Sequence, residues 1–264
     1  TLPVAPGGTA TLRERARNSF DGPDGRLDAI TYELGGLSLA PLYITLDGKG
    51  DFFAFATPDL IIARAGYEKA ADKPLRDLSE RLASERLAAL QKDGAHKFSG
   101  PVRIRNVRLF DPRAKALTAA SDVVVSGRTI AEVLPAGSKA TPGETVIDGA
   151  GGTLVPGMFE MHGHLGQEDA LLNVLAGITS LRDMGNDNAV LDQLIHRIEA
   201  GEVAGPRVVR SGFIEGKSQF SARNGILAST EAEALDAVRW YAARGYWQAK
   251  LYNSMDPAWA PAVV

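Results

Sequence analysis

Apolar and polar residues alternate at two places early in the chain, within 30–34 and within 42–46, which predicts two strands. The second strand leads into Asp47-Gly48-Lys49-Gly50 and then into an aromatic run over 52–55, as a hairpin would. Residues 1–25 are rich in glycine, proline and charge, and we expect a loop there. Between 70 and 92, leucines recur at helical spacing and predict an amphipathic helix that ends near Gly94.

From residue 99 onward, short apolar runs are separated by turn residues about every ten positions. The runs lie at 102–109, 122–125, 128–133 and 145–148, and the turns include Asp111-Pro112, Gly127 and the glycines of 149–152. This rhythm is typical of a small β-sandwich.

After residue 153, strand and helix patterns alternate. We expect strands at 154–161, 177–185, 206–212 and 246–252, and helices at 168–176, 188–200 and 230–244, with a long loop over 212–227. Thr230 and Glu233 have the spacing of a capping box. Four consecutive β/α units predict a parallel sheet with right-handed crossovers.

The predicted fold class is α/β, with the first half of a (β/α)8 TIM barrel as its main part. A complete barrel needs about 200 residues or more, and too few follow residue 157. A smaller open α/β sheet is the alternative. We divide the chain into an N-terminal α+β segment of unknown role (1–98), part of a β-sandwich (99–153) and four β/α units (154–264). The other half-barrel is then expected in further sequence or in another chain.

Composition narrows the function classes. A hydrophobic share of 45% and a charged share of 23% are those of a soluble globular protein. The net charge of -3, with no basic cluster, gives no reason to expect nucleic acid, and no apolar run is long enough to span a membrane. Because the chain has no cysteine, a metal would need histidine, carboxylate or modified lysine ligands. Because the first residue is Thr1, we expect that a leader was removed or that the chain begins inside a longer one, and a cytoplasmic or an extracytoplasmic location both remain open.

The candidate chemistry lies at the ends of two predicted strands. His162 and His164 are two residues apart, so both imidazoles point to the same side of the first barrel strand. Lys250 ends the fourth strand, and barrel enzymes carry their catalytic residues at these ends. Desolvation there would make the lysine nucleophilic toward carbon dioxide, which gives a carbamate ligand. A lone His-x-His pair or a lone lysine is weak evidence for a metal site, and we expect mid-helix His196 to be solvated or to have a packing role.

Residues 100–264 strongly resemble the amidohydrolase superfamily, in particular its imidazolonepropionase-like and Xaa-Pro dipeptidase-like members. Each matching motif is weak alone, and their combination is specific. The motifs are Ile147-Asp148-Gly149 with Gly151, Val155-Pro156-Gly157-Met158-Phe159-Glu160-Met161-His162-Gly163-His164, Ala176-Gly177-Ile178-Thr179-Ser180-Leu181-Arg182-Asp183-Met184-Gly185, Gly205-Pro206-Arg207 and Ala249-Lys250-Leu251-Tyr252.

The resemblance implies a composite β-sandwich completed by the C-terminus, and a metal site for one or two divalent ions, with zinc expected first. His162 and His164 would bind one ion, and Lys250, carboxylated by carbon dioxide, would bridge to a second. Two further histidines and a general-base aspartate are expected beyond Val264, so no catalytic residue lies in this chain. Glu160 stands where the family usually has aspartate. Glu160 and Asp183 are candidates for residues that orient the metal ligands without binding the metal themselves.

By the same resemblance, the intact protein would be a metal-dependent hydrolase that cleaves a carbon–nitrogen bond with a metal-activated water. The substrate would be a small molecule such as an amide, a cyclic amide or a dipeptide. We expect the 264-residue chain alone to be inactive. The alternatives are a non-catalytic barrel used for binding or scaffolding, and a separate interaction module over 1–98. A homo-oligomer is also compatible with the sequence.

Overall fold

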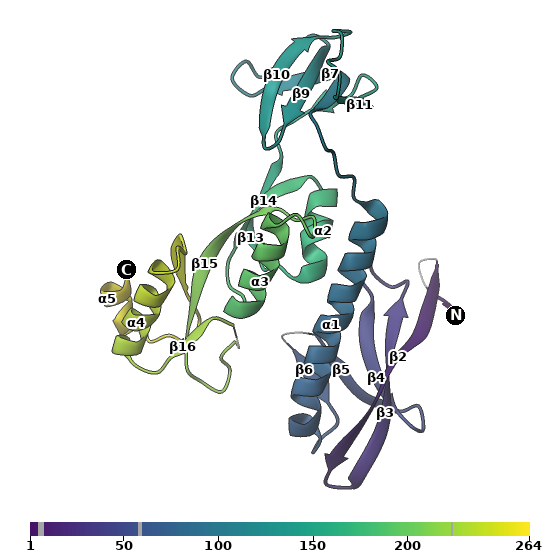
Figure 1. Cartoon of the computed structure of the whole chain (residues 1–264). Helices are drawn as coiled ribbons and strands as arrows, with labels where there is room; N and C mark the ends of the chain where they lie inside the picture. Colours follow the sequence, from purple (N-terminus) through teal and green to yellow (C-terminus); the bar gives the residue numbers. More distant parts are fainter. Residues whose placement is uncertain (5–7, 58–59, 223) are drawn as a thin grey trace. The chain divides into compact units, whose positions relative to one another are not determined.

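The computed structural model describes residues 1–4, 8–57, 60–222 and 224–264. They form two compact units: Thr1–Asp93 together with Phe159–Val264, and Gly94–Met158 (Figure 1). The predicted three-part division at 98/99 and 153/154 stays a prediction. Within the described ranges, no helix has the length and apolar character needed to cross a membrane.

The N-terminal part of the first unit is a six-stranded antiparallel sheet in chain order. Its strands are β1 (Leu2–Pro3), β2 (Thr9–Gly22), β3 (Gly25–Gly35), β4 (Leu42–Asp47), β5 (Phe52–Ala56) and β6 (Ile61–Ala63). The alternating stretches are found as β3 and β4, and the predicted hairpin joins β4 to β5. Asp47 closes that turn, since its Oδ1 accepts hydrogen bonds of 2.9 Å from the backbone N–H groups of Lys49 and Asp51.

The expectation of a loop over residues 1–25 is wrong. Most of this stretch is β2, which pairs with β3 along nearly its whole length. Only Ala10 and Phe20 of β2 are buried, and charged residues lie at many of its other positions. The strand therefore lacks the period-2 alternation by which a half-buried strand is recognised.

Helix α1 (Glu68–Gly94) covers the predicted 70–92 segment and ends at the expected glycine. Leu75, Leu78 and Leu82 pack on the N-terminal sheet, in a core that includes Phe20 and Phe53. Farther along, Leu87 belongs to a different core, formed with helices of the C-terminal part. One helix thus joins the two parts of the first unit.

The second unit, Gly94–Met158, contains one sheet with the order β10-β9-β7-β11, and β8 and β12 also pair with β7. The strands are β7 (Val102–Asp111), β8 (Ala116–Leu117), β9 (Ser121–Ser126), β10 (Thr129–Pro135), β11 (Thr145–Asp148) and β12 (Thr153–Leu154). All predicted strands of this region are found. The described residues of the unit supply one sheet, so the composite β-sandwich stays a prediction.

The C-terminal part of the first unit is a parallel sheet whose strands alternate with helices, as predicted. Strand order is β13-β14-β15-β16, and β17 pairs with β15. The elements are β13 (Met158–Gly163), α2 (Gln167–Leu175), β14 (Ile178–Asp183), α3 (Asn188–Glu199), β15 (Arg207–Gly216), β16 (Ile226–Ala228), α4 (Glu231–Ala242), β17 (Gln248–Leu251), the 3-10 turn η1 (Pro257–Trp259) and α5 (Ala260–Val263).

Two predicted boundaries in this region are wrong. The expected strand 154–161 is divided, because Pro156 has no N–H to donate: Leu154 pairs with β7 of the second unit, and β13 begins only at Met158. The expected loop over 212–227 is shorter, since β15 continues to Gly216 and β16 follows at Ile226. Residues 211–216 are all buried, and a strand buried on both faces shows no alternation.

Candidate metal centre

His162 and His164 lie at the end of β13, and Lys250 lies near the end of β17. The Nζ atom of Lys250 is 3.2 Å from the Nε2 atom of His162. Strands β13 and β17 are separated by β14 and β15, which in a flat sheet would put their axes about 14 Å apart. Side-chain contact across that distance requires a curled sheet. The structure therefore brings the ends of β13 and β17 together.

The two histidines are side by side, with ring centroids 5.6 Å apart. The Nδ1 atom of His164 is 2.6 Å from the carbonyl oxygen of Gly185. Because a carbonyl oxygen can only accept, Nδ1 carries the proton and Nε2 of His164 keeps its lone pair. A backbone carbonyl behind the ring is the usual way in which proteins orient a metal-binding histidine.

Lys250 is partly buried among aromatic rings. Its Nζ lies 5.1 Å from the ring centroid of Tyr252 and 5.8 Å from that of Phe213. As an ammonium, Lys250 donates its hydrogen bond to Nε2 of His162, which then has its proton on Nδ1. Both histidines consequently present unprotonated Nε2 atoms at one edge of the sheet.

Glu160 and Asp183 support this edge through backbone hydrogen bonds. Glu160 accepts from the N–H of His162 at 2.8 Å. Asp183 is completely buried at the end of β14, where it accepts from the N–H of Leu165 at 2.8 Å and of Gly185 at 3.0 Å. The Asn186 side-chain amide also donates to it, at 3.0 Å. Asp183 thereby fixes the loops that follow His164 and β14.

Among the residues that the structure describes, no three histidine, aspartate or glutamate side chains gather as a metal-binding group. The convergent set at this edge is two histidines and one lysine. His196 lies apart from it, exposed on α3, with its Nδ1 at 2.8 Å from the carbonyl oxygen of Asp192.

A buried glutamate that sequence reasoning did not single out lies at the end of β15. Glu215 is 1% exposed, and its Oε1 accepts from the N–H of Ser254 at 2.7 Å and of Gly216 at 3.1 Å. It joins the segment after β17 to the end of β15. The sequence does show a glutamate directly after apolar residues, but the predicted loop began at residue 212, so Glu215 was placed in that loop.

No family model and no curated protein matches the chain. Solved structures do match its fold. A protein from Bifidobacterium longum, provisionally assigned as a prolidase, has a TM-score of 0.53 at 22% identity, over 61% of this chain and 42% of that one. A bottromycin amidohydrolase matches with a TM-score of 0.49 at 17% identity, over 72% and 38%. A Xaa-Pro dipeptidase matches with a TM-score of 0.48 at 21% identity, over 57% and 46%.

The chain thus spans less than half the length of these three structures. At 22% identity, the match to the B. longum protein shows a shared fold. The chain therefore shares its fold with this protein over the matched part, and the assignment to the amidohydrolase superfamily stays a prediction from the sequence motifs.

Proposed function

We propose that this chain contributes part of the active site of a metal-dependent hydrolase acting on carbon–nitrogen bonds. The observation that carries the proposal is the convergence of His162, His164 and Lys250 at one edge of the parallel sheet. The shared fold with the B. longum protein supports it, because active sites of β/α barrels lie at this edge. A dipeptide is the first substrate class to test, given the assignment of that neighbour, followed by cyclic amides.

The donor atoms suit a divalent metal such as zinc. Neutral imidazole Nε2 atoms are the ligands that zinc accepts most readily in a cysteine-free protein, and His164 already has the required tautomer. Bound there, a divalent ion would supply Lewis-acid activation of water and of the scissile carbonyl. Manganese and iron accept the same ligands.

We further propose that Lys250 acts as its carbon dioxide adduct. The unprotonated Nζ amine would attack carbon dioxide, forming a nitrogen–carbon bond and releasing a proton to solvent, so that the side chain ends in a carbamate. This converts a cationic group 3.2 Å from His162 into an anionic oxygen ligand able to bridge two ions. The rings of Tyr252 and Phe213 lie beside the lysine, with centroids 5.1 Å and 5.8 Å from Nζ.

Equilibrium dialysis of the chain against zinc, in bicarbonate buffer, tests the proposed centre. We expect the wild type to retain zinc and His162→Ala to bind it on the order of tenfold or more weakly. His196→Ala is the matched control, since it removes an exposed histidine far from the sheet edge. Equal zinc binding by His162→Ala and His196→Ala would refute the centre.

The lysine adduct has its own test. With ¹³C-bicarbonate, a carbamate carbon resonance should appear in the wild type and disappear in Lys250→Ala and Lys250→Arg, because guanidinium does not add carbon dioxide. The same resonance in both variants would show that Lys250 is not the modified residue.

We propose that the general base and the remaining ligands come from further sequence or from another chain, since the chain spans 42% of its B. longum neighbour. The zinc-loaded 264-residue chain should then hydrolyse Xaa-Pro dipeptides no faster than a zinc-free blank. Clear zinc-dependent turnover by the isolated chain would contradict this part of the proposal. Absence of turnover in the completed protein as well would favour the non-catalytic barrel.

A further inference from the structure

A cavity of about 490 Å³ lies in the first unit, beside the candidate metal centre. Its wall combines the N-terminal sheet, α1 and the loops after β13 and β14, with residues such as Tyr43, Phe55, Ala83, His164, Glu168 and Asn186. This volume is within the usual range for small-molecule sites. About half of the wall comes from residues 40–83, in the segment for which the sequence predicted no role.

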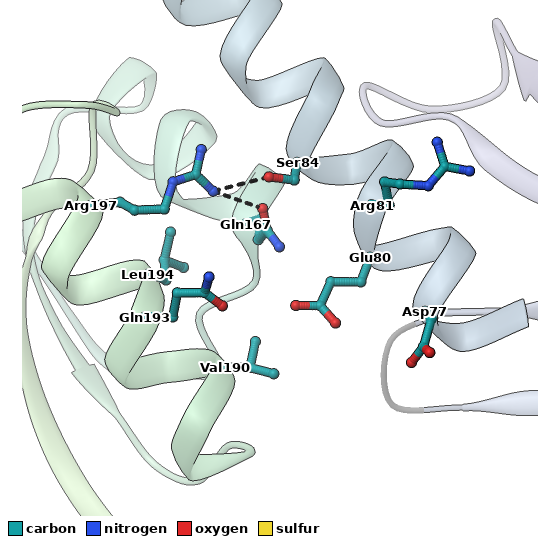
Figure 2. A pocket seen from close by; sticks show the side chains of 9 residues that line it. All are labelled: Asp77, Glu80, Arg81, Ser84, Gln167, Val190, Gln193, Leu194 and Arg197. Carbon is teal, nitrogen blue, oxygen red and sulfur yellow. Dashed lines mark hydrogen bonds between the residues drawn. The ribbon is translucent and has the colours of Figure 1, made fainter. Parts of the chain in front are cut away.

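A smaller cavity of about 290 Å³ adjoins it between α1 and α3. Asp77, Glu80, Gln167 and Val190 line both. Figure 2 shows the Glu80 side chain extending from α1 toward Gln167 and Val190, while Arg81 points away. The Arg197 guanidinium lines the smaller cavity and donates hydrogen bonds to Ser84 at 3.1 Å and to Gln167 at 3.2 Å. The helices are thus held together where the two cavities meet.

Two residues that line the larger cavity each carry a polar side-chain atom that is buried and has no hydrogen-bond partner. Tyr43 is 7% exposed, and its hydroxyl group has no hydrogen-bond partner. Oε1 of Glu168 also has no hydrogen-bond partner, and its contact with Nε of Arg86, at 3.7 Å, is an ion pair. Buried polar groups nearly always have hydrogen-bond partners in native proteins, so two such atoms without one, on residues that line one cavity, point to a missing partner.

The charged groups that line the cavity indicate the sign of the charge that the missing partner would carry. Five carboxylates line the cavity, from Asp77, Glu80, Glu168, Asp169 and Asp187, against the guanidinium of Arg76. Arg76 is itself paired with Asp72 at 3.0 Å. The rest of the wall includes apolar groups such as Phe55, Leu165 and Val190. An anion would be repelled here, whereas a cation with an apolar body fits both features.

We propose that this cavity binds a small primary ammonium compound with an apolar group. On binding, the side chains of Tyr43 and Glu168 would turn so that the buried hydroxyl oxygen and Oε1 accept hydrogen bonds from the ammonium, and the apolar group would lie against Phe55 and Ala83. The N-terminal segment thereby becomes a ligand-binding wall next to His164. The proposal stands on the cavity and its unpaired atoms and does not require hydrolysis.

The ionisation of Tyr43 is consistent with this role. Burial, followed by the negative charge of Glu168, raises the pKa of Tyr43 to about 12. The hydroxyl group therefore stays neutral at physiological pH, and its oxygen can accept from an ammonium.

Titration of the 264-residue chain with phenethylamine, followed by NMR chemical shifts, tests the proposal. We expect millimolar binding, about tenfold tighter than for the neutral analogue 2-phenylethanol, and no binding of 3-phenylpropionate. Ala83→Trp should fill the cavity and abolish amine binding, whereas Ala88→Trp, at an exposed position of the same helix, should not.

Tyr43→Phe separates binding from folding. Because the hydroxyl is unpaired, the variant should keep or raise the Tm, yet bind phenethylamine more weakly. No amine binding, equal binding of amine and carboxylate, or full binding by Tyr43→Phe would overturn the proposal. His162→Ala should still bind the amine, since His162 does not line the cavity. If the wild type bound the amine but no zinc, only the proposed function would be contradicted.

Discussion

The carboxylate of Asp183 holds together the two loops that surround the candidate metal centre. It has no exposed surface, and its hydrogen bonds go to the loop after His164 and to the loop after β14. A buried carboxylate in this position cannot be removed without leaving several donors unpaired. Its importance lies in positioning His164, whose ring is fixed by Gly185 of the second loop.

Asp183→Ala should destabilise the protein by about 2–5 kcal/mol, because it leaves buried N–H groups without acceptors. Urea unfolding measures this. The matched control is Asp187→Ala, which removes only the N-cap of α3 and should cost about 1 kcal/mol. Equal costs for the two variants would show that Asp183 does not organise the loops.

Glu168 predicts a pH dependence of stability. Burial raises its pKa above the ordinary value of 4.5, with Arg86 acting in the opposite direction. The folded state then binds the proton more tightly than the unfolded state, so stability falls as the pH rises from 4.5 through the raised pKa. In Glu168→Gln, urea unfolding between pH 4 and about 7 should show a smaller loss of stability with rising pH. An identical slope in both proteins would contradict this.

At the scale of residues, the features that depend on local spacing could be predicted, whereas the burial of single polar side chains could not. The histidine pair could be predicted because the period-2 geometry of a strand is local, and the nearness of Lys250 followed from the predicted barrel, in which the ends of the strands meet. The contacts of Tyr43, Glu168 and Glu215 could not be predicted, since each depends on chain segments distant in sequence. No pattern around a single glutamate shows that it will be buried.

At the scale of elements, α1 serves two hydrophobic cores. Leu75, Leu78 and Leu82 lie on one side of the helix, and Leu87 is turned about 140° from Leu82 at 3.6 residues per turn. That rotation directs Leu87 to the core of α2 and α3, which contains Leu165 and Leu191. The helix therefore couples the stability of the N-terminal sheet to that of the β/α part.

Leu87→Ala should cost about 2–5 kcal/mol, because the side chain is 1% exposed and its removal leaves a cavity. Leu90→Ala, one turn later and 42% exposed, is the control and should cost less than about 1 kcal/mol. Urea unfolding with a fluorescence probe at Trp240 reports on the β/α part. If the two variants unfolded alike, α1 would not contribute to that core.

Elements with clear periodicity were predicted well. The leucine spacing gave α1 to within two residues, and Thr230 marked the start of α4, where its side chain accepts from the N–H of Glu233 at 3.2 Å. Strand β2 was missed because its many charged positions remove the alternation, and β15 was cut short because it is buried on both faces. The existence of β2 and the end of β15 both depend on pairing with neighbouring strands, and a short stretch of sequence does not contain that information.

At the scale of the whole molecule, each unit has its own stabilising chemistry. The second unit is held by a buried ion pair between Arg103 and Glu144, 2.6 Å apart, with the Asp122 carboxylate 3.9 Å from the same guanidinium. The hydrogen bond from Arg103 holds the pKa of Glu144 below its ordinary value of 4.5. This pair joins β7 to the segment that leads into β11.

Glu144 therefore stabilises the second unit above pH 4.5, and that contribution is lost as the pH falls through its lowered pKa. Glu144→Gln should lower the protection of β7 and β11 amides against hydrogen exchange at pH 7, with little further loss on acidification. Wild-type protection in these strands should approach that of the variant at low pH. Unchanged protection in the variant at pH 7 would contradict this account.

The central claim concerns the whole curled sheet, because only its curvature brings β13 and β17 together at a candidate metal centre. A crystal of the 264-residue chain soaked in zinc, with an anomalous difference map, tests it most directly. We predict a peak at about 2.0–2.1 Å from Nε2 of His162 or His164, on the side facing Lys250. Zinc bound only elsewhere on the molecule, or side chains of His162 and Lys250 that lie far apart, would contradict the account.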